Sequence, residues 1–327
     1  MKLNTHSWIA YQVLCLFLIS TTDALKESLT YHIVGGVPAI KDEFPFMVNV
    51  YIDNWPSCGG AVLANEWIAT AGHCVNAAYI DDESNQEANV YRPLNATRLK
   101  IAVGSIAKNS PTLLPIKSIV VHPDYTPGSE MNDLALLQLY QPLAFNRSVQ
   151  RVPISKSKVL PGQNVTALGW GSNESNVSAV SLLKVDFNIA PLDPCRMMNP
   201  EFTDNQGSQI CAGMTPGRDT CYGDSGGPLV QQINGTISLL GITSYGGSIV
   251  SGGPSCGGDN NIAFYTHVSQ YMNFLRNTTG LPDAQFGPVQ STNSTPTTDQ
   301  TTSNAHLSQS FNFFSLFVIF VCSLNFL

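Results

Sequence analysis

The stretch that decides the fold is Cys221-Tyr222-Gly223-Asp224-Ser225-Gly226-Gly227-Pro228. A serine among glycines is poorly suited to the interior of a helix or strand, because glycine permits backbone conformations that residues with a Cβ resist. The stretch therefore predicts a tight loop that holds Ser225 outward, with its backbone N–H beside that of Gly223. Two such donors are what a developing oxyanion needs in acyl transfer.

Two shorter motifs precede this loop in the chain. The first, Thr70-Ala71-Gly72-His73-Cys74, follows an apolar run, and the second places Asp133 at the head of another apolar run at residues 134–139. A buried carboxylate without a partner would be costly, so Asp133 needs a donor.

Together these motifs resemble the chymotrypsin-like (S1) serine peptidases, in particular the trypsin-like subgroup, over about residues 33–280. The resemblance implies an all-β fold of two six-stranded antiparallel β-barrels packed together with a C-terminal helix. It also implies that Ser225 is the nucleophile, His73 the general base and Asp133 the residue that orients the base. Gly223 and Ser225 would form the oxyanion hole.

The pattern of apolar residues, glycines and prolines in the rest of the chain favours the same fold class. Many short apolar runs, such as residues 46–51 and 165–171, are separated by Gly and Pro, as in β-barrels. Residues 269–277 are expected to form the closing helix, with Ser269 as its N-cap. Residues 75–92 are acidic and lack an apolar period, which predicts a surface loop.

Ile33-Val34-Gly35-Gly36 resembles the new N-terminus that S1 peptidases expose on activation. The resemblance implies a zymogen in which the freed amine of Ile33 pairs with Asp224. The residue before the cut is His32, where Lys or Arg is common in the family. We therefore expect a separate convertase to cut after His32.

Substrate preference is expected to lie in four positions. By the resemblance, Asp219 is the pocket-floor carboxylate, which would select Arg or Lys before the scissile bond. Ser244 and Gly246 match the strand that pairs with the substrate backbone, and Gly246 leaves the pocket mouth open. Ala263 stands where a pocket-wall glycine is usual, and its methyl group would narrow the pocket. Residues 247–255 form a long loop at the rim.

The chain has eight cysteines, of which Cys15 and Cys322 lie in terminal segments that we expect to be removed. The remaining six predict three disulfides in an oxidising compartment, although sequence alone allows many pairings. The resemblance implies the pairs Cys58–Cys74, Cys195–Cys211 and Cys221–Cys256. Neither a CxxC spacing nor a His-x₃-His spacing favours zinc, and residues 104–121 contain no carboxylate for calcium. No metal or cofactor is expected.

The two ends of the chain have the composition of processing signals. Residues 1–24 have the pattern of a secretory signal peptide, and residues 25–32 would be the activation propeptide. Residues 281–310 read as a Ser/Thr-rich linker, and residues 311–327 are apolar. The small residues Ser303, Asn304 and Ala305 precede this tail, as in a GPI-attachment signal, and Ser303 is the expected attachment residue. The alternative interpretation of the tail is a membrane-spanning helix. The expected location is the outer face of the plasma membrane, or secreted.

Several Asn-x-Ser/Thr sequons suit a secreted, glycosylated protein. They lie at Asn95, Asn146, Asn164, Asn173, Asn176, Asn234, Asn277 and Asn293. Charged residues make up only 12% of the chain and its net charge is −7, which speaks against nucleic acid as a partner.

These features predict a serine endopeptidase, made as a zymogen and acting on protein or peptide substrates, with protein inhibitors as further partners. The alternative is a catalytically weak homologue that serves as a surface binding or adhesion module; His32, Ala263 and the rim loop favour it. An α/β-hydrolase esterase would need the nucleophilic serine to be followed in the chain by the acidic residue and then the histidine, whereas His73 and Asp133 precede Ser225 here.

Overall fold

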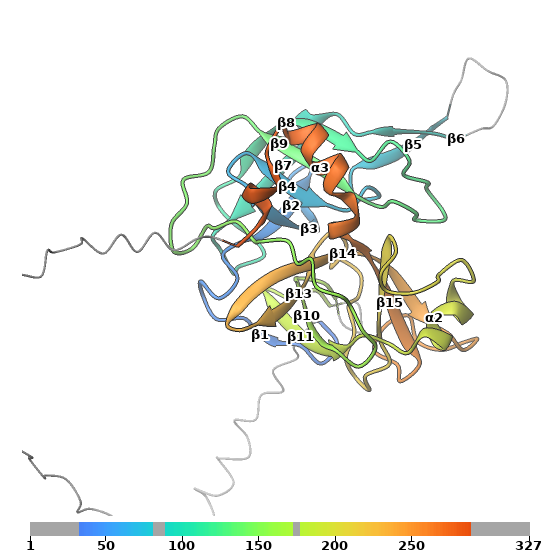
Figure 1. Ribbon diagram of the computed structural model, residues 1–327. Coiled ribbons are helices and arrows are strands. Elements are labelled where there is room, and N and C mark those ends of the chain that lie inside the picture. Colours follow the sequence, from blue (N-terminus) through green and yellow to red (C-terminus); the bar gives the residue numbers. More distant parts are fainter. Residues whose placement is uncertain (1–32, 81–88, 173–176, 289–327) are drawn as a thin grey trace, which may run out of the picture. The chain divides into compact units, whose positions relative to one another are not determined.

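Antiparallel strands are the main secondary structure of the computed structural model, which describes residues 33–80, 89–172 and 177–288 (Figure 1). The expected signal peptide, propeptide and apolar tail lie outside these residues. So do the sequons at Asn173, Asn176 and Asn293, whereas the other five sequon asparagines are exposed. Within the described ranges, no helix is both long and apolar enough to cross a bilayer.

The first sheet is a closed barrel in the order β2-β3-β4-β9-β8-β7. Its strands are β2 (Met47–Ile52), β3 (Trp55–Ala64), β4 (Trp67–Thr70), β7 (Leu99–Val103), β8 (Leu114–Val121) and β9 (Ala135–Leu139). Apolar side chains such as Val48, Ile68 and Leu136 are fully buried in the core that this barrel surrounds. The predicted six-stranded barrel is therefore confirmed for this half of the chain.

The second sheet has the order β1-β11-β10-β13-β14-β15-β12. Its strands are β1 (Val37–Pro38), β10 (Asn164–Gly169), β11 (Leu183–Asn188), β12 (Gln209–Gly213), β13 (Pro228–Ile233), β14 (Thr236–Ser248) and β15 (Asn261–His267). A single bridge between Ile189 and Ala212 joins the end of β11 to β12. The six strands from β11 to β12 therefore curve until their two ends meet at this single bridge. Strand β1 pairs with the outer edge of β11 as a seventh strand.

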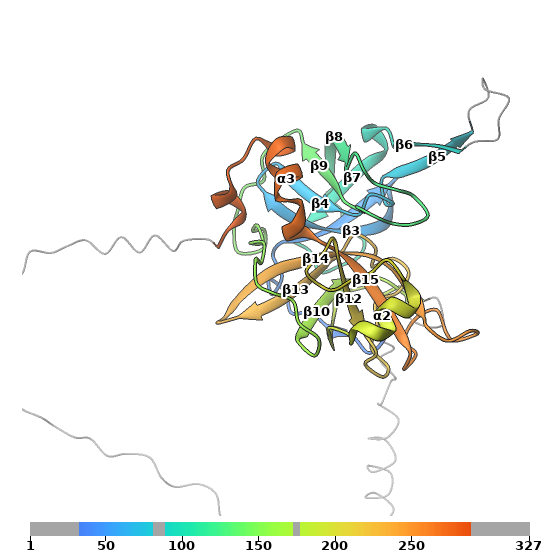
Figure 2. The same ribbon diagram turned by 45° about the vertical axis from the view of Figure 1, so that its right-hand side comes forward.

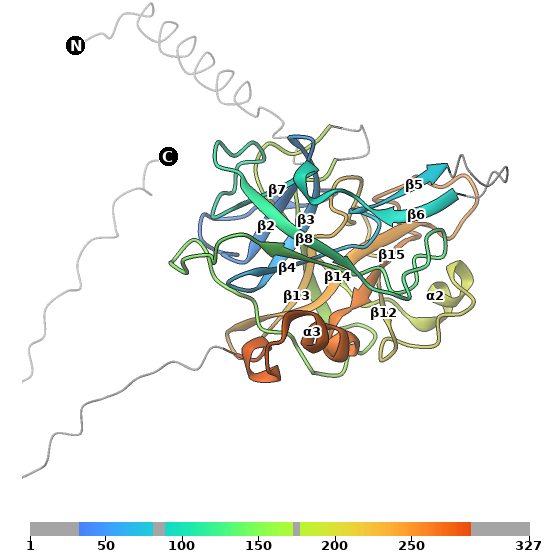
Figure 3. The same cartoon turned by 90° about the horizontal axis from the view of Figure 1, so that it is seen from above.

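One expected surface loop is instead a hairpin. Residues 75–92 contain β5 (Asn76–Ile80) and most of β6 (Asn89–Pro93), which pair antiparallel and project from the barrel in all three views (Figures 1–3). The prediction failed because backbone pairing in a projecting hairpin does not need an alternating apolar pattern. The tip of the hairpin, residues 81–88, lies outside the described residues.

The C-terminal helix is present, but it begins later than predicted. A 3₁₀ turn, η2 (Val268–Tyr271), precedes α3 (Met272–Thr279), so Ser269 does not cap the helix; its hydroxyl is bonded to His267 Nε2 instead. Gly280 ends α3 with a φ of 68°. The rings of Tyr271 and Phe274 pack against His122, which holds the helix on the first barrel.

The folded region also extends beyond residue 280, where the linker was expected to start. A second short turn, η3 (Asp283–Phe286), places Phe286 in the core with 1% exposure. Arg151 donates to the carbonyls of Gln285 and Gly287 and fixes this segment. The boundary of the domain therefore lies after residue 286.

The three expected disulfides are present. Cys58 pairs with Cys74, Cys195 with Cys211, and Cys221 with Cys256. The second of these ties the short helix α2 (Leu192–Met198) to β12. The other two lie beside the segments that carry His73 and Asp219.

Candidate active site

Asp133 and His73 meet at the end of the first barrel, in the turns before β9 and after β4. Asp133 is completely buried. Its Oδ1 accepts the backbone N–H of His73 at 2.8 Å, and its Oδ2 lies 2.8 Å from Nδ1 of the His73 ring. Because an ionised carboxylate only accepts hydrogen bonds, this contact places a proton on Nδ1 and leaves Nε2 as the basic nitrogen.

The second sheet also contacts this carboxylate. Ser244, on β14, donates its hydroxyl to Asp133 Oδ2 at 2.5 Å, and Thr266, on β15, donates to the Asp133 backbone carbonyl at 2.7 Å. Ser244 sits where the register between β14 and β15 slips by one residue. Such a bulge re-aims a side chain, and here the serine hydroxyl reaches across to the first barrel.

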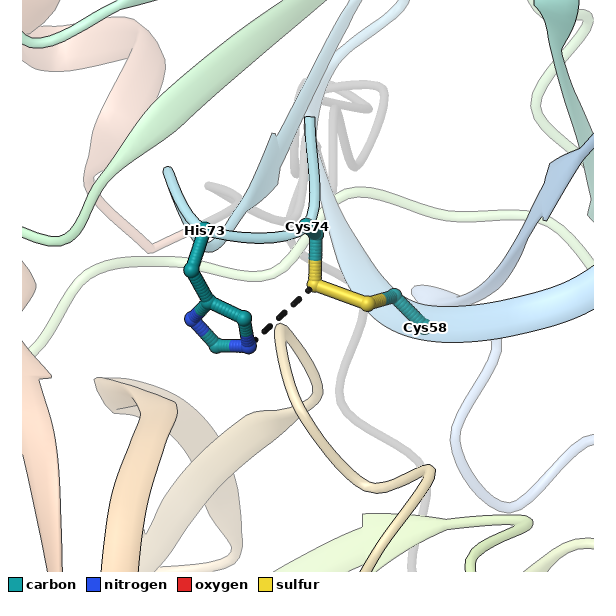
Figure 4. A group of neighbouring side chains, drawn as sticks. All are labelled: Cys58, His73 and Cys74. Carbon is teal, nitrogen blue, oxygen red and sulfur yellow. Dashed lines mark hydrogen bonds between the residues drawn. A yellow bond between two sulfur atoms is a disulfide. The ribbon is translucent and has the colours of Figure 1, made fainter. Parts of the chain in front are cut away.

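The free nitrogen of the His73 ring faces the Cys58–Cys74 disulfide (Figure 4). Nε2 lies 3.8 Å from Cys74 Sγ. Burial alone would lower the pKa of the His73 ring, but the hydrogen bond and charge of Asp133, together with the charge of Glu130, raise this pKa above its ordinary value. The ring is therefore a stronger base than a histidine in water.

Ser225 lies in a loop whose backbone is fixed on both sides. Its carbonyl accepts the N–H of Gly59 on β3, and the next residue, Gly226, donates to the carbonyl of Thr243 on β14. Gly226 has a φ of 75°, and a Cβ there would lie 2.3 Å from Thr70 Oγ1. Only glycine fits this close approach, as the sequence motif predicted.

The loop carries two backbone donors that have no acceptor. Among the described residues, neither the N–H of Gly223 nor that of Ser225 makes a hydrogen bond, whereas the N–H of Asp224 between them bonds the Cys221 carbonyl. Ser225 Oγ likewise has no hydrogen-bond partner in the described part of the chain. Catalytic hydrogen bonds are often long or unformed in ligand-free enzymes.

A cavity of about 230 Å³ opens beside Ser225. Its walls come from the segment before Ser225, from β14 and from the end of the rim loop, and they comprise Thr220, Cys221, Tyr222, Ser225, Thr243, Ser244, Tyr245, Gly246, Ser255 and Cys256. Ser244 and Gly246 thus line the cavity as well as the expected substrate strand. Among the described residues, neither Asp219 nor Ala263 lines this cavity.

Asp219 precedes the cavity-lining residue Thr220 in the chain and is 4% exposed. Its Oδ2 accepts hydrogen bonds from the Gly257 N–H at 3.0 Å and from Asn261 Nδ2 at 3.2 Å. Burial raises the pKa of Asp219 to about 6, although these donors oppose the rise. Ala263 is 3% exposed and pairs with Gly246 across β14 and β15.

The residues expected to act in activation, Ile33 and Asp224, are both associated with the second sheet. Ile33 is fully buried, and Val34 forms a bridge with Asp219. Asp224 is fully buried as well, and its carboxylate accepts the N–H groups of Gly171 at 2.8 Å and Cys221 at 2.9 Å. Burial raises the pKa of Asp224 to about 7.

Two contacts of the site were not anticipated from the sequence. The first is the Ser244 hydroxyl, since Ser244 was expected to act only through its backbone. The second is Glu130, which accepts from the Tyr125 hydroxyl at 2.7 Å and acts on the His73 ring. Glu130 has a positive φ of 52°, an uncommon backbone conformation that no sequence pattern signals.

Two groups of side chains at the site bring metal-type donor atoms within 4.8 Å of one another. In the first, Cys58 and Cys74 are joined to each other as a disulfide beside His73, so they offer no thiolate. In the second, His73, Glu130 and Asp133, the two oxygens of Asp133 already accept hydrogen bonds from His73 and Ser244. Neither group is a free set of metal ligands.

The trypsin family model matches residues 33–275, the region that holds all of these groups. The chain belongs to the trypsin family. It is therefore a serine endopeptidase, as the motifs predicted. It is 31% identical to the venom peptide isomerase heavy chain of Agelenopsis aperta, over 74% of this chain and 98% of that protein. It is 28% identical to a trypsin of Phaedon cochleariae, over 83% of this chain and 97% of that protein.

A third relative is much longer. Ovochymase of Halocynthia roretzi is 29% identical over 78% of this chain, but the match takes in only 16% of ovochymase. The likeness therefore concerns the peptidase domain and not the rest of that protein.

Proposed function

We propose that this trypsin-family member hydrolyses peptide bonds with Ser225 as nucleophile, His73 as general base and Asp133 as the orienting acid. One observation carries the proposal: a buried carboxylate fixes Nδ1 of His73, and two unpartnered N–H groups lie in the loop that carries Ser225. This is the pairing of an oriented base with a prepared oxyanion site.

In the proposed reaction, the Ser225 hydroxyl turns toward Nε2 of His73, gives up its proton and attacks the scissile carbonyl carbon. The carbonyl oxygen becomes negative and accepts the N–H groups of Gly223 and Ser225. The His73 ring then passes the proton to the leaving amine, and an acyl-enzyme remains on Ser225. Water, deprotonated by His73 in the same way, hydrolyses this ester and restores the serine.

The proposed preference is for Arg or Lys before the scissile bond. A cationic side chain in the cavity beside Ser225 would point toward Asp219, and its charge would lower the raised pKa of that carboxyl and keep it ionised. The expected rim loop begins later than predicted, because Gly247 and Ser248 belong to β14. Ala263 and the remaining loop, residues 249–255, would restrict how deeply the side chain enters. The substrates are proteins or peptides, and protein inhibitors would compete for the same cavity.

The proposed zymogen is activated by a convertase that cuts after His32. The Ile33 amine would then pair with Asp224, which is buried and whose carboxylate is bonded, among the described residues, only to the N–H groups of Gly171 and Cys221. We further propose the secretory pathway and the outer face of the membrane as the location, through the lipid anchor expected from the C-terminal sequence.

The deciding experiment is turnover of peptides that end in Arg, Lys or Phe by protein trimmed to begin at Ile33, beside a Ser225→Ala control. The proposal expects Arg and Lys turnover that disappears in the control. Turnover of Phe alone would keep the triad and refute the Asp219 preference.

The binding-module alternative draws on one observation, namely that Asp219 is not among the described residues that line the cavity. A folded, trimmed protein that turns over none of the three peptides would favour that alternative.

A further inference from the structure

Lys108 is anchored between the two halves of the fold. It follows β7, and its backbone carbonyl accepts the side chains of Asn49 and Tyr51 from β2 of the first barrel. Its backbone N–H donates to the Val180 carbonyl at 2.9 Å, on the side of the second sheet. The backbone of Lys108 is thus fixed from both sides, and its side chain starts from a defined point.

The ammonium group of Lys108 donates to the carbonyl of Trp170 at 3.2 Å. That carbonyl belongs to the same peptide group as the N–H of Gly171, which donates to Asp224 Oδ1 at 2.8 Å. One peptide group therefore separates a cation from a buried anion, with its oxygen toward the cation and its hydrogen toward the anion. Both ends of the peptide dipole are favourably placed, and hydrogen bonds in such a chain strengthen one another.

Asp224 needs such a charge. It is fully buried, and the other titratable groups that act on it or sense it are Asp219, an anion, and Tyr265, whose pKa burial raises well above the ordinary value. Lys108 is the group whose positive charge lowers the Asp224 pKa. In the uncut chain the nitrogen of Ile33 is the amide that follows His32, so it carries no charge.

We propose that Lys108 is a positioning residue for the oxyanion loop: through the Trp170–Gly171 peptide group it compensates the charge of Asp224 before the Ile33 amine exists. The inference rests on the proposed oxyanion role of Gly223 and Ser225. Its consequence is that the uncut chain has a partly formed site with low but measurable reactivity at Ser225.

The test compares Lys108→Met with Lys108→Arg in two forms of the protein, the uncut chain and the chain trimmed to begin at Ile33. Lys117→Met, which removes an exposed lysine of β8, is the matched control. The readout is the rate at which a fluorophosphonate labels Ser225, with Ser225→Ala as the blank. In the uncut chain, Lys108→Met is expected to lower this rate by about tenfold, the equivalent of about one pKa unit of lost interaction.

In the trimmed chain the Ile33 amine supplies its own charge, so the same substitution is expected to change the rate by less than about threefold, a few tenths of a pKa unit. A merely structural role would damage both forms equally. Equal loss in both forms, or no loss in the uncut form, would overturn the proposal.

A pH series adds a second criterion. Burial lowers the pKa of Lys108 from its ordinary value, so labelling of the uncut wild type should fall as pH rises toward that pKa. Because arginine stays charged over this range, Lys108→Arg should keep its labelling rate to higher pH. Coincident alkaline limbs for lysine and arginine would contradict the proposal.

Amide hydrogen exchange gives a readout that does not depend on catalysis. In a Ser225→Ala background, Lys108→Met should speed exchange in peptides covering residues 169–172 and 221–227 of the uncut chain, but not of the trimmed chain. If the wild type labels in neither the uncut nor the trimmed form, the proposed function is wrong. The exchange result then decides the role of Lys108 by itself, and unchanged exchange refutes it.

Discussion

Ser244 and Asp133, 111 residues apart in the chain, are joined by a hydrogen bond of 2.5 Å from the serine hydroxyl to Oδ2. The serine belongs to β14 of the second sheet, and the aspartate immediately precedes the β9 segment of the first barrel. The same carboxylate oxygen lies 2.8 Å from the His73 ring. The orientation of His73 therefore depends on both sheets and on their packing together.

Replacing Ser244 with alanine should lower the free energy of unfolding by about 1.5–3 kcal/mol, since hydrogen bonds to charged groups contribute about that much. Activity should fall as well, because Asp133 loses one of the donors that hold it. Urea unfolding and the kcat/KM of the trimmed protein measure the two effects. Ser248→Ala, on the same strand, is the control and should change stability by less than about 0.5 kcal/mol. Equal stability of the two variants would contradict this role for Ser244.

The acid limb of the pH–rate profile should lie above the ordinary histidine pKa. The proposed mechanism needs a neutral His73, and Asp133 and Glu130 raise its pKa against the effect of burial. Activity is therefore lost, as pH falls, at a higher pH than for a histidine in water. Glu130→Gln removes one of the charges that raise this pKa, so the limb should move to lower pH.

The profile of kcat/KM against pH measures this limb in the free enzyme. Glu201→Gln, an exposed substitution, serves as control and should leave the limb in place. A Glu130→Gln profile that coincides with the wild type would show that Glu130 does not act on the ring.

Ala263→Gly should increase turnover of Arg substrates. In the proposed specificity, Ala263 limits how deeply an Arg side chain enters the cavity toward Asp219, so removal of its methyl group should open the approach for a long guanidinium. Asp219→Asn should lower Arg and Lys turnover by about a hundredfold, as expected when one partner of a buried charge pair is removed. The measurement is kcat/KM on matched Arg, Lys and Phe peptides. An increase for Phe alone would mean that the wall does not control access to Asp219.

The Cys221–Cys256 disulfide should matter for both stability and the pocket. Both cysteines line the cavity, and they close a loop with a sequence separation of 35. Replacing both with serine should cost about 2–4 kcal/mol and weaken binding of Arg substrates. The matched variant without Cys195–Cys211, which ties α2 to β12, should lose stability but keep its KM. Thermal unfolding and KM together separate the two variants, and an unchanged KM in the first would refute the pocket role.

The parts of the fold that were predicted from the sequence are those that depend on residues close together in the chain. The glycine-rich loop around Ser225 was predictable because Gly226 leaves no room for a Cβ beside Thr70. The cysteine pairs followed from the family resemblance, and the all-β class followed from the many short apolar runs. These features are fixed by a few neighbouring residues.

The parts that were missed depend on contacts between distant segments. The Ser244 hydroxyl reaches Asp133 because the register between β14 and β15 shifts by one residue at this point. The sequence of a strand does not reveal such a shift. Lys108 finds Trp170 across 62 residues through a loop without a motif. The β5–β6 hairpin pairs backbone N–H and C=O groups, which every residue possesses apart from the N–H that proline lacks. Tertiary geometry decides all three, and local sequence does not record it.

The slip at Ser244 has a consequence for how such a chain can change. It divides β14 into a segment up to Thr243 and Ser244, which holds the Ser225 loop and Asp133, and a segment beyond it that leads to the rim loop. A residue gained or lost before the slip would turn Ser244 away from Asp133. One gained or lost at residues 249–255 would alter only the rim. In the proposed specificity, a change in the length of the rim loop would alter substrate choice and leave the contact between Ser244 and Asp133 in place.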